Sequence, residues 1–505
     1  MRRRAFRAVL APLALLAALL AVPGVASADS LDAVGNEVLG DTVPLNTMWV
    51  LVAAFLVLFM QAGFALLEIG FSRGKNAGTG VAKILTNLSI AAIAYYAVGF
   101  AFAFGTGSSE GDLIGTTGFF LQGFGDPQAA FFPSGLGLSD ATIESKWLFQ
   151  FAFCAVSLAI VWGTTLERIK YSAYVVYAIV FAAVIYPIGS HWVFGGGWLQ
   201  SNLGMQDFAG STAVHLIGAT GALAALLLLG PRKGKYGPDG KPRAIPGHSM
   251  PLVGLGILIL FIGWFGFNPG STLNATDGRF GEIAMVTLLG GASGVLGAFL
   301  AGRFLQRTID IGMVGNGMIA GLVAITAPSG YVEAWAALPI GLVAGLIVVA
   351  GVIMIDKKLD DPVGALSAHG LAGIWGTLAC GIFTAPRFAE YNAFGEAGLV
   401  YSQSFHQLGT QALGVVVVFG FVFVLSFATF AAIKATIGLR VSEEEEDAGL
   451  DIVEHGMYGY PEQFIPPTEI GAASTGPAAP AYAGSTASPV TAMRADTPAT
   501  GGARA

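Results

Sequence analysis

The stretches Asp207-Phe-Ala-Gly-Ser-Thr-Ala-Val-His215 and Asp361-Pro-Val-Gly-Ala-Leu-Ser-Ala-His369 decide how this sequence is interpreted. Each places an aspartate eight residues before a histidine inside an apolar run. An imidazole is costly in hydrocarbon, so intramembrane histidines usually face the interior of a helix bundle and mark an ion or proton path. Two such histidines at matched spacing predict a duplicated transport unit.

The composition places the chain among membrane proteins before any motif is considered. Of its 505 residues, 54% are apolar and 11% are charged, and the mean hydropathy is +0.69. A soluble protein of several domains carries a much larger share of charged residues. The 71 glycines suit helices that pack closely through small residues, because helices in lipid gain little from hydrophobic burial. We therefore expect an all-α polytopic membrane protein.

The remaining composition limits the classes of function. Cys154 and Cys380 are the two cysteines, and both lie in apolar runs, which favours packing over a disulfide or a metal pair. The sequence contains no nucleotide-binding loop, kinase-like domain or metal-ligand cluster. We therefore expect neither an enzyme nor a nucleic-acid-binding protein, and no cofactor.

The chain divides into a leader, a membrane domain and a two-part tail. Residues 1–28 join a basic start to a short Leu/Ala-rich run and a small-residue cleavage site, which predicts a secretory signal peptide. The membrane domain is expected at 45–437, and a structured tail at 438–469. Residues 470–505 are rich in Ala, Pro, Gly, Ser and Thr, and this composition predicts disorder.

The membrane domain contains eleven apolar segments, each near the roughly 20 residues that cross a bilayer. They lie at about 46–71, 80–105, 145–165, 171–190, 208–230, 251–268, 281–302, 309–327, 333–355, 364–384 and 407–436. With the mature N-terminus outside, 15 basic residues fall in the loops on one side and 3 in the loops on the other. The positive-inside rule then places the basic side, and the C-terminus, in the cytosol.

Eleven spans can be two five-span halves plus one, and halves with an odd number of spans must lie inverted in the membrane. Leu56-Val-Leu-Phe59 in the first span resembles Leu258-Ile-Leu-Phe261 in the sixth, and the Asp–His stretches open the fifth and tenth. A rise of about 1.5 Å per residue puts each histidine roughly 12 Å below its aspartate. Across a core of about 30 Å the imidazoles would differ in depth by about 6 Å, so they can meet near the midplane.

Other residues around this point fit a cation site. Asp207 and Asp361 are expected to cap their helices, and Asp207 could also attract a cation to an outer vestibule. The segments Phe149-Gln-Phe-Ala-Phe153 and Gly263-Trp-Phe-Gly-Phe-Asn-Pro-Gly-Ser271 supply aromatic faces at the same side, although an interfacial aromatic belt would look alike. Haem ligation is another use for two facing histidines, but nothing else indicates a redox protein. Glu68, late in the first span, is expected to pair with a basic group or to reach water.

Several motifs together resemble the ammonium transporter (Amt/Mep/Rh) family, bacterial Amt-type. They are Met60-Gln-Ala-Gly-Phe-Ala-Leu-Leu-Glu68 leading to Arg73-Gly-Lys-Asn76, the Gly263–Ser271 segment, the two Asp–His stretches and Gly438-Leu-Arg-Val441. The resemblance covers about residues 45–460. It implies a homotrimer in the cell membrane with one pore per subunit.

The resemblance also assigns roles to residues. An outer ammonium site would comprise Phe153, Phe194 and Ser271, with Phe153 and Phe267 as the gate; His215, His369 and Trp264 would line the pore. Phe194 stands where many bacterial members have Trp, and Trp198 could compensate. Gly364 replaces an acidic residue that some members carry, which would leave the inner vestibule less negative.

The function implied is transport in which ammonium is bound outside and deprotonated, and ammonia crosses an apolar pore, with net proton transfer. A neutral ammonia channel of the Rh type and an ammonium sensor remain as alternatives. The tail at 438–469 would be cytosolic and regulatory and would couple the subunits. A trimeric PII-type signal protein would be the expected partner at the cytosolic face.

Overall fold

The computed structural model describes residues 42–105, 111–122 and 141–465. Within these ranges the chain is almost entirely helical, with two isolated β-bridges and no strand. The expected signal peptide at 1–28 and the expected disordered segment at 470–505 lie outside the described residues.

The described part of the chain contains ten helical segments that are long and apolar enough to cross a membrane. Two of the first five are single helices, α2 (Thr42–Phe71) and α5 (Ile143–Thr164). Gly74–Phe104 contains α3 (Ala77–Ala94) and α4 (Phe100–Phe104), and Ser211–Leu229 contains α9 (Ile217–Leu229). Tyr171–Ser201 contains α6 (Tyr171–Val180), α7 (Tyr186–Phe194) and α8 (Trp198–Ser201). The others are Met250–Thr272 with α10 (Met250–Phe267), α11 (Arg279–Leu305), α13 (Ala334–Ile355), Leu366–Phe383 with α14 (Ala372–Phe383), and α17 (His406–Thr436).

An eleventh apolar helix, α12 (Ile311–Thr326), is shorter than the others. It corresponds to the eighth expected span, and its short length is compensated by a following 3₁₀ turn, Pro328–Gly330. The total is consistent with the eleven spans that the sequence predicted.

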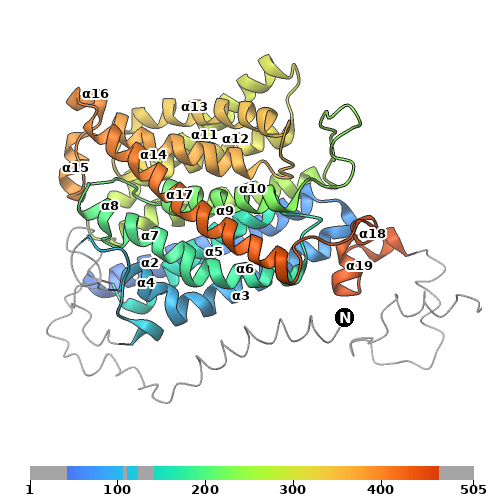
Figure 1. The fold of residues 1–505 in the computed structure, drawn as a ribbon. Helices are drawn as coiled ribbons and strands as arrows, with labels where there is room; N and C mark the ends of the chain where they lie inside the picture. The colour runs from blue at the N-terminus through green and yellow to red at the C-terminus, as the bar shows by residue number, and fades with distance from the viewer. Residues whose placement is uncertain (1–41, 106–110, 123–140, 466–505) are drawn as a thin grey trace, which may run out of the picture.

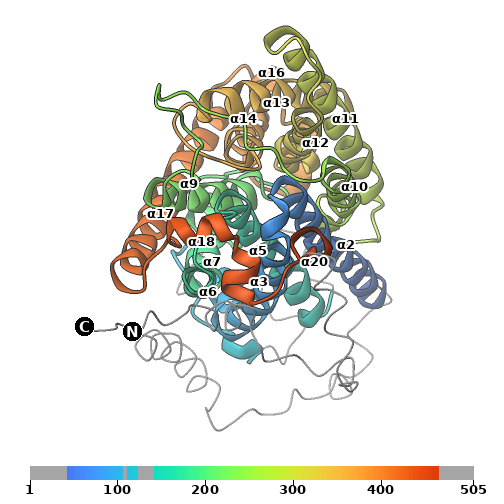
Figure 2. The same cartoon turned by 90° about the vertical axis from the view of Figure 1, so that its right-hand side faces the viewer.

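The helices run side by side and leave two distinct ends (Figure 1). One end carries α8 and the short helices α15 (Pro386–Asn392) and α16 (Leu399–Ser402), and we call it the vestibule end. The other carries α18 (Glu443–Ala448), α19 (Leu450–His455) and α20 (Pro461–Phe464), and we call it the tail end. Figure 2 looks onto the tail end and shows α5 near the middle of the bundle.

Glycines bring α11, α12 and α13 into backbone contact. A Cβ atom added to Gly294 would lie 2.3 Å from the carbonyl oxygen of Gly317, and one added to Gly345 would lie 2.1 Å from that of Gly294. Only glycine permits such an approach, and close backbone packing supplies the dispersion energy that holds helices together in lipid. These glycines therefore allow the helices to pack closely against one another.

The two predicted Asp–His helices begin later than expected and do not begin as regular α-helices. Each starts with a π-helical turn, η6 (Ser211–Leu216) or η9 (Leu366–Leu371), and continues into α9 or α14. The residue three positions after each aspartate is a glycine with positive φ, +122° at Gly210 and +75° at Gly364. This conformation strains other residues and is not helical, so the chain turns at Gly210 and Gly364, where the sequence predicted helix. It also gives Gly364 a backbone reason for being glycine.

Candidate functional site

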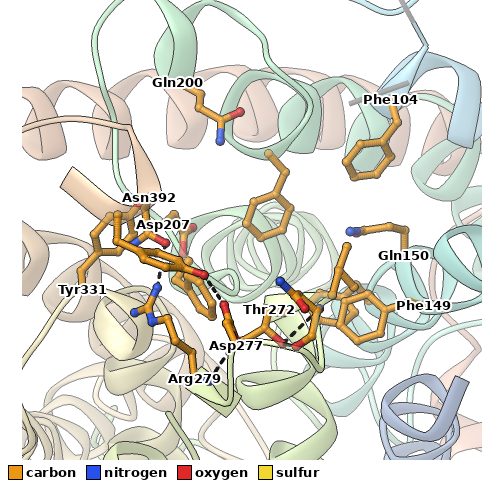
Figure 3. A pocket seen from close by; sticks show the side chains of 17 residues that line it. Phe104, Phe149, Gln150, Gln200, Asp207, Thr272, Asp277, Arg279, Tyr331 and Asn392 are labelled. Carbon is orange, nitrogen blue, oxygen red and sulfur yellow. Dashed lines mark hydrogen bonds between the residues drawn. The ribbon is translucent and has the colours of Figure 1, made fainter. Parts of the chain in front are cut away.

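A cavity of about 150 Å³ opens at the vestibule end. Figure 3 shows Phe104, Phe149 and Gln150 on one side of it, and Tyr331, Asn392 and Arg279 on the other. Four of the expected substrate-site residues, Phe153, Phe194, Ser271 and Asp207, line this one cavity. Trp198 is not among the lining residues and packs against Trp192, so the expected compensation for Phe194 is wrong.

Below the cavity, aromatic rings form a continuous column into the bundle. Phe149 contacts Phe153 at a centroid distance of 4.5 Å, and Phe153 stacks on Phe267 at 4.1 Å. The ring of Phe267 lies 5.4 Å from that of His215, and the His215 ring lies 5.2 Å from that of His369. All five side chains are buried. The stacked phenyl rings therefore separate the cavity from the histidines.

The two imidazoles are joined directly. Their Nδ1 atoms lie 3.2 Å apart, and one must donate a proton to the other, because a neutral imidazole has one donor and one acceptor nitrogen. The Nε2 atom of His215 is buried without a hydrogen-bond partner. Two axial ligands of a haem lie on opposite sides of the iron, with their nitrogens about 4 Å apart at about 2.0 Å per bond, so the 3.2 Å contact does not fit haem ligation by this pair.

Trp264 forms a wall beside the histidines. Its ring stacks on His215 at 5.4 Å, and its indole nitrogen donates to the Thr326 hydroxyl at 2.9 Å. The indole is fully buried and its single donor is satisfied. The wall is therefore apolar toward the pore and fixed in orientation.

Carboxylates hold the turns that carry the histidines. Asp207 accepts hydrogen bonds from the four successive amides of Gly210, Ser211, Thr212 and Ala213, at 2.8–2.9 Å. Burial raises the pKa of Asp207 to about 6, while these four hydrogen bonds oppose the shift. Asp361 accepts from the amides of Val363, Gly364 and Leu366, and burial likewise raises its pKa. Both aspartates thus stabilise the otherwise unpaired amides at a helix start.

The rim of the cavity contains residues that sequence reasoning missed. Arg279 lies over the ring of Tyr391 at 4.2 Å and donates to the Gly330 carbonyl, while the Tyr391 hydroxyl donates to Asp277. Tyr331 closes another part of the wall. These residues come from loops and short helices that are distant in sequence, so no local spacing signals their meeting.

A second cavity lies on the other side of the histidines, toward the tail end. His369 and Glu68 both line it, and apart from Asn316 the other side chains around it are apolar or absent. It leaves about 20 Å³ for the centres of water molecules, which is enough for one water. It differs from the vestibule cavity in its small size and its mainly aliphatic lining.

The tail docks onto its own subunit. The Asp451 carboxylate accepts from the amides of Gly78 and Thr79 at the start of α3, at 2.9 and 2.7 Å. Lys75 donates to the carbonyls of Glu446 and Asp447, and Arg440 of the tail donates to the carbonyls of Leu229 and Pro231. The tail therefore lies against the tail end of the membrane domain.

Residues 48–460 match the model of the Ammonium Transporter Family. The chain is 43% identical over 454 residues to Ammonium transporter Amt2 of Archaeoglobus fulgidus, covering 87% of this chain and 93% of that protein. It is 36% identical over 442 residues to a putative ammonium transporter of Synechocystis, covering 86% and 92%.

Solved structures agree with this assignment. One titled "Sensor Amt Protein" superposes with a TM-score of 0.74 at 37% identity, over 82% of this chain and 99% of that one. Candida albicans Mep2 superposes with a TM-score of 0.71 at 28% identity, over 80% and 88%. The chain therefore belongs to the ammonium transporter family, and it is a multi-span membrane protein of a transporter family rather than an enzyme.

Proposed function

We propose that the protein takes up ammonium by binding NH4+ in the vestibule cavity, removing a proton and conducting NH3 past His215 and His369. The observation that supports this most directly is the contact between two buried imidazoles beneath a column of stacked phenyl rings. A bare cation loses its hydration in such a site at a large free-energy cost, whereas neutral ammonia loses much less. The unpartnered Nε2 of His215 can hydrogen-bond the neutral molecule.

The vestibule supplies groups that suit a small cation. Phe153 and Phe194 line the cavity, and cation–π attraction to such rings contributes about 0.5–2 kcal/mol. The Ser271 hydroxyl donates to the Phe267 carbonyl at 2.8 Å, so its oxygen remains free to accept a hydrogen bond from ammonium. Both Asp207 oxygens already accept two amide bonds each, so Asp207 acts through its charge rather than as a direct ligand.

The Phe153–Phe267 stack acts as the gate in this proposal. At 4.1 Å the rings are in contact, so ammonia passes only when one of them rotates. Rotation of a buried ring needs space, and the vestibule cavity beside Phe153 provides it.

The orientation of the protein in the membrane follows from the distribution of its basic residues. Arg73, Arg168 and Arg232 lie at the tail end, where buried ion pairs with Glu167 and Asp360 hold them. With the positive-inside rule, the tail end faces the cytosol of a bacterial cell and the vestibule faces outward, as does the mature N-terminus. The tail then lies where a PII-type signal protein could reach it, and we propose a homotrimer as the working assembly.

The test is the current that purified protein produces on a solid-supported membrane after a jump in ammonium concentration. We expect a saturable current from the wild type and none from the double variant His215→Leu/His369→Leu, with trimer assembly and melting temperature retained. An undiminished current in the double variant would contradict the histidine pore.

Two alternatives give other results in the same assay. A neutral channel of the Rh type would acidify or alkalinise vesicles without any current. A sensor is suggested by the solved relative titled as one, and it would bind ammonium without either current or flux. Isothermal titration beside the current measurement separates these two cases.

A further inference from the structure

Glu68 is a buried carboxylate for which the transport cycle described above has no use. It lies within the last turn of α2, at the tail end, is 1% exposed, and neither of its oxygens has a hydrogen-bond partner. A carboxylate in an apolar site without partners is strongly destabilising, so such a group is seldom retained for packing. The burial of Glu68 without a hydrogen-bond partner therefore needs a functional explanation.

The position of Glu68 connects it to the pore. It lines the tail-side cavity together with His369, and among the described residues around that cavity these two are the ionisable ones. The cavity has room for one water molecule. A water there can bridge groups that do not touch, and it can pass a proton between them.

Lys83 on α3 is the charged partner of Glu68. Its side chain is fully buried, its ammonium has no hydrogen-bond partner, and its charge acts on Glu68 across a gap that no direct bond closes. The nearest ring face is that of Trp162, 6.0 Å from the ammonium. An ion pair kept for stability would be closed and hydrogen-bonded, because the attraction must exceed the loss of hydration. This pair is open.

The groups facing Glu68 from each neighbouring element can be named. Lys83 from α3 is the charge that acts on it, while Glu167, Arg168 and Glu454 act on Lys83 from farther toward the tail end. From α6, the Tyr174 hydroxyl donates to the Lys83 carbonyl at 2.6 Å. No charge other than that of Lys83 compensates Glu68 in the described part of the chain.

Polar groups continue from this pair along the bundle. Gln61 lies seven residues before Glu68 on α2 and therefore on the same face, and Asn87 lies four after Lys83 on α3. Asn87 donates to Gln61 at 3.0 Å and accepts from the Trp162 indole at 3.2 Å. A buried polar stripe thus runs beside the apolar pore.

We propose that the Glu68 carboxylate accepts the proton that ammonium releases in the pore, and that Lys83 keeps Glu68 ionised between turnovers. The inference rests on the proposed function. In this step an N–H bond of NH4+ breaks and its electron pair stays on nitrogen, giving NH3. The proton reaches Glu68 through the histidines and the cavity water, and an O–H bond forms on the carboxylate. Glu68 then releases the proton to water at the tail end and regains its charge.

The first experiment compares Glu68→Gln with Glu68→Asp in proteoliposomes. Glutamine keeps the size and polarity of glutamate but cannot take up a proton, whereas aspartate can. We expect Glu68→Gln to lower the ammonium-driven current at least tenfold while ammonia flux, followed by internal pH in stopped flow, stays within twofold of wild type. Glu68→Asp should restore part of the current. Glu282→Gln makes the same chemical change at the vestibule end and should leave the current unchanged.

A second variant separates proton acceptance from a purely structural role. Glu68→Gln leaves Lys83 buried and uncompensated, so this variant can be unstable; Glu68→Gln/Lys83→Met removes both charges and should melt as the wild type does. Under the proposal the double variant folds and still carries no current. A current that returns in the double variant would reduce Glu68 to a counter-ion for Lys83.

Other outcomes are equally decisive. A wild-type current in Glu68→Gln would overturn the proposal, and so would a folded variant that loses ammonia flux and current together, because the pore would then be blocked. If the wild-type protein itself gave no current, the proposed function would fail before any Glu68 variant was measured. The two failures are therefore distinguishable.

Discussion

Asp451 provides a test of how the tail is held. Its carboxylate, which is fully buried, accepts from the Gly78 and Thr79 amides, the Thr79 hydroxyl and the Gly459 amide at 2.7–3.0 Å. One group thus caps α3 and fixes the tail to it. Because α3 and the tail are close in space but far apart in sequence, loss of this group should loosen the tail and leave the membrane domain folded.

The magnitude follows from these contacts. Removing a helix cap costs about 0.5–2 kcal/mol, and each hydrogen bond to a charged group contributes about 1.5–3 kcal/mol. The freed amides regain water when the tail undocks, so the contributions do not add fully, and we take about 2–3 kcal/mol for Asp451→Ala. At about 1.4 kcal/mol per tenfold, the equilibrium constant for docking falls by roughly 30- to 150-fold.

Amide hydrogen exchange measures this change directly. Protection of the amides in α18 and α19 should fall by that factor in Asp451→Ala, while protection in α5 stays as in the wild type. Asp447→Ala is the matched control: its exposed carboxylate pairs with Lys233, and exposed pairs contribute little. Unchanged protection in Asp451→Ala would show that Lys75 and Arg440 hold the tail without it.

Three further predictions concern the vestibule and the tail. Phe194→Trp should lower the half-saturating ammonium concentration a few-fold, measured from currents, because indole is the stronger cation–π partner; no change would mean that this wall does not limit binding. Asp207, with a pKa of about 6, is ionised above that pH and neutral below it, so the half-saturating concentration should rise between pH 7.5 and 5.5 at constant ammonium. Deletion of 470–505 should leave uptake intact, whereas deletion from Val441 onward should reduce it; equal uptake at matched trimer levels would argue against a role for 441–469.

Much of this arrangement can be predicted from the sequence because membrane helices obey few rules. Span length and charge bias predict the number and direction of the helices, and this prediction brings His215 and His369 to similar depth, in agreement with their contact in the structure. Asp207 and Asp361 were expected to cap helix starts, and their hydrogen bonds to successive amides agree with this. The local sequence was sufficient to predict each of these features.

Features that depend on tertiary contacts could not be predicted. The π-helical turns that follow the aspartates are not revealed by a residue count. Arg279 and Tyr391 meet across more than a hundred residues. Glu68 stood out as an intramembrane acid, but nothing in the sequence identified Lys83 as its partner. Trp198 was expected to compensate for Phe194 from its place in the following loop, and its ring packs against Trp192.

The two halves share their centre and differ at their mouths. Both histidines lie on π-helical turns that follow a capping aspartate and a glycine with positive φ. The backbone around the histidine pair therefore does not by itself favour transport in one direction across the membrane. The vestibule cavity is wide and rich in aromatic rings, whereas the tail-side cavity is small, mainly aliphatic and lined by Glu68. A proton carried from one mouth to the other moves one charge across the membrane, and 100 mV then contributes about 2.3 kcal/mol, or roughly fifty-fold accumulation. Ammonia alone would gain nothing from the potential, so under the mechanism we propose it is Glu68, outside the repeated core, that determines whether the pore concentrates its substrate.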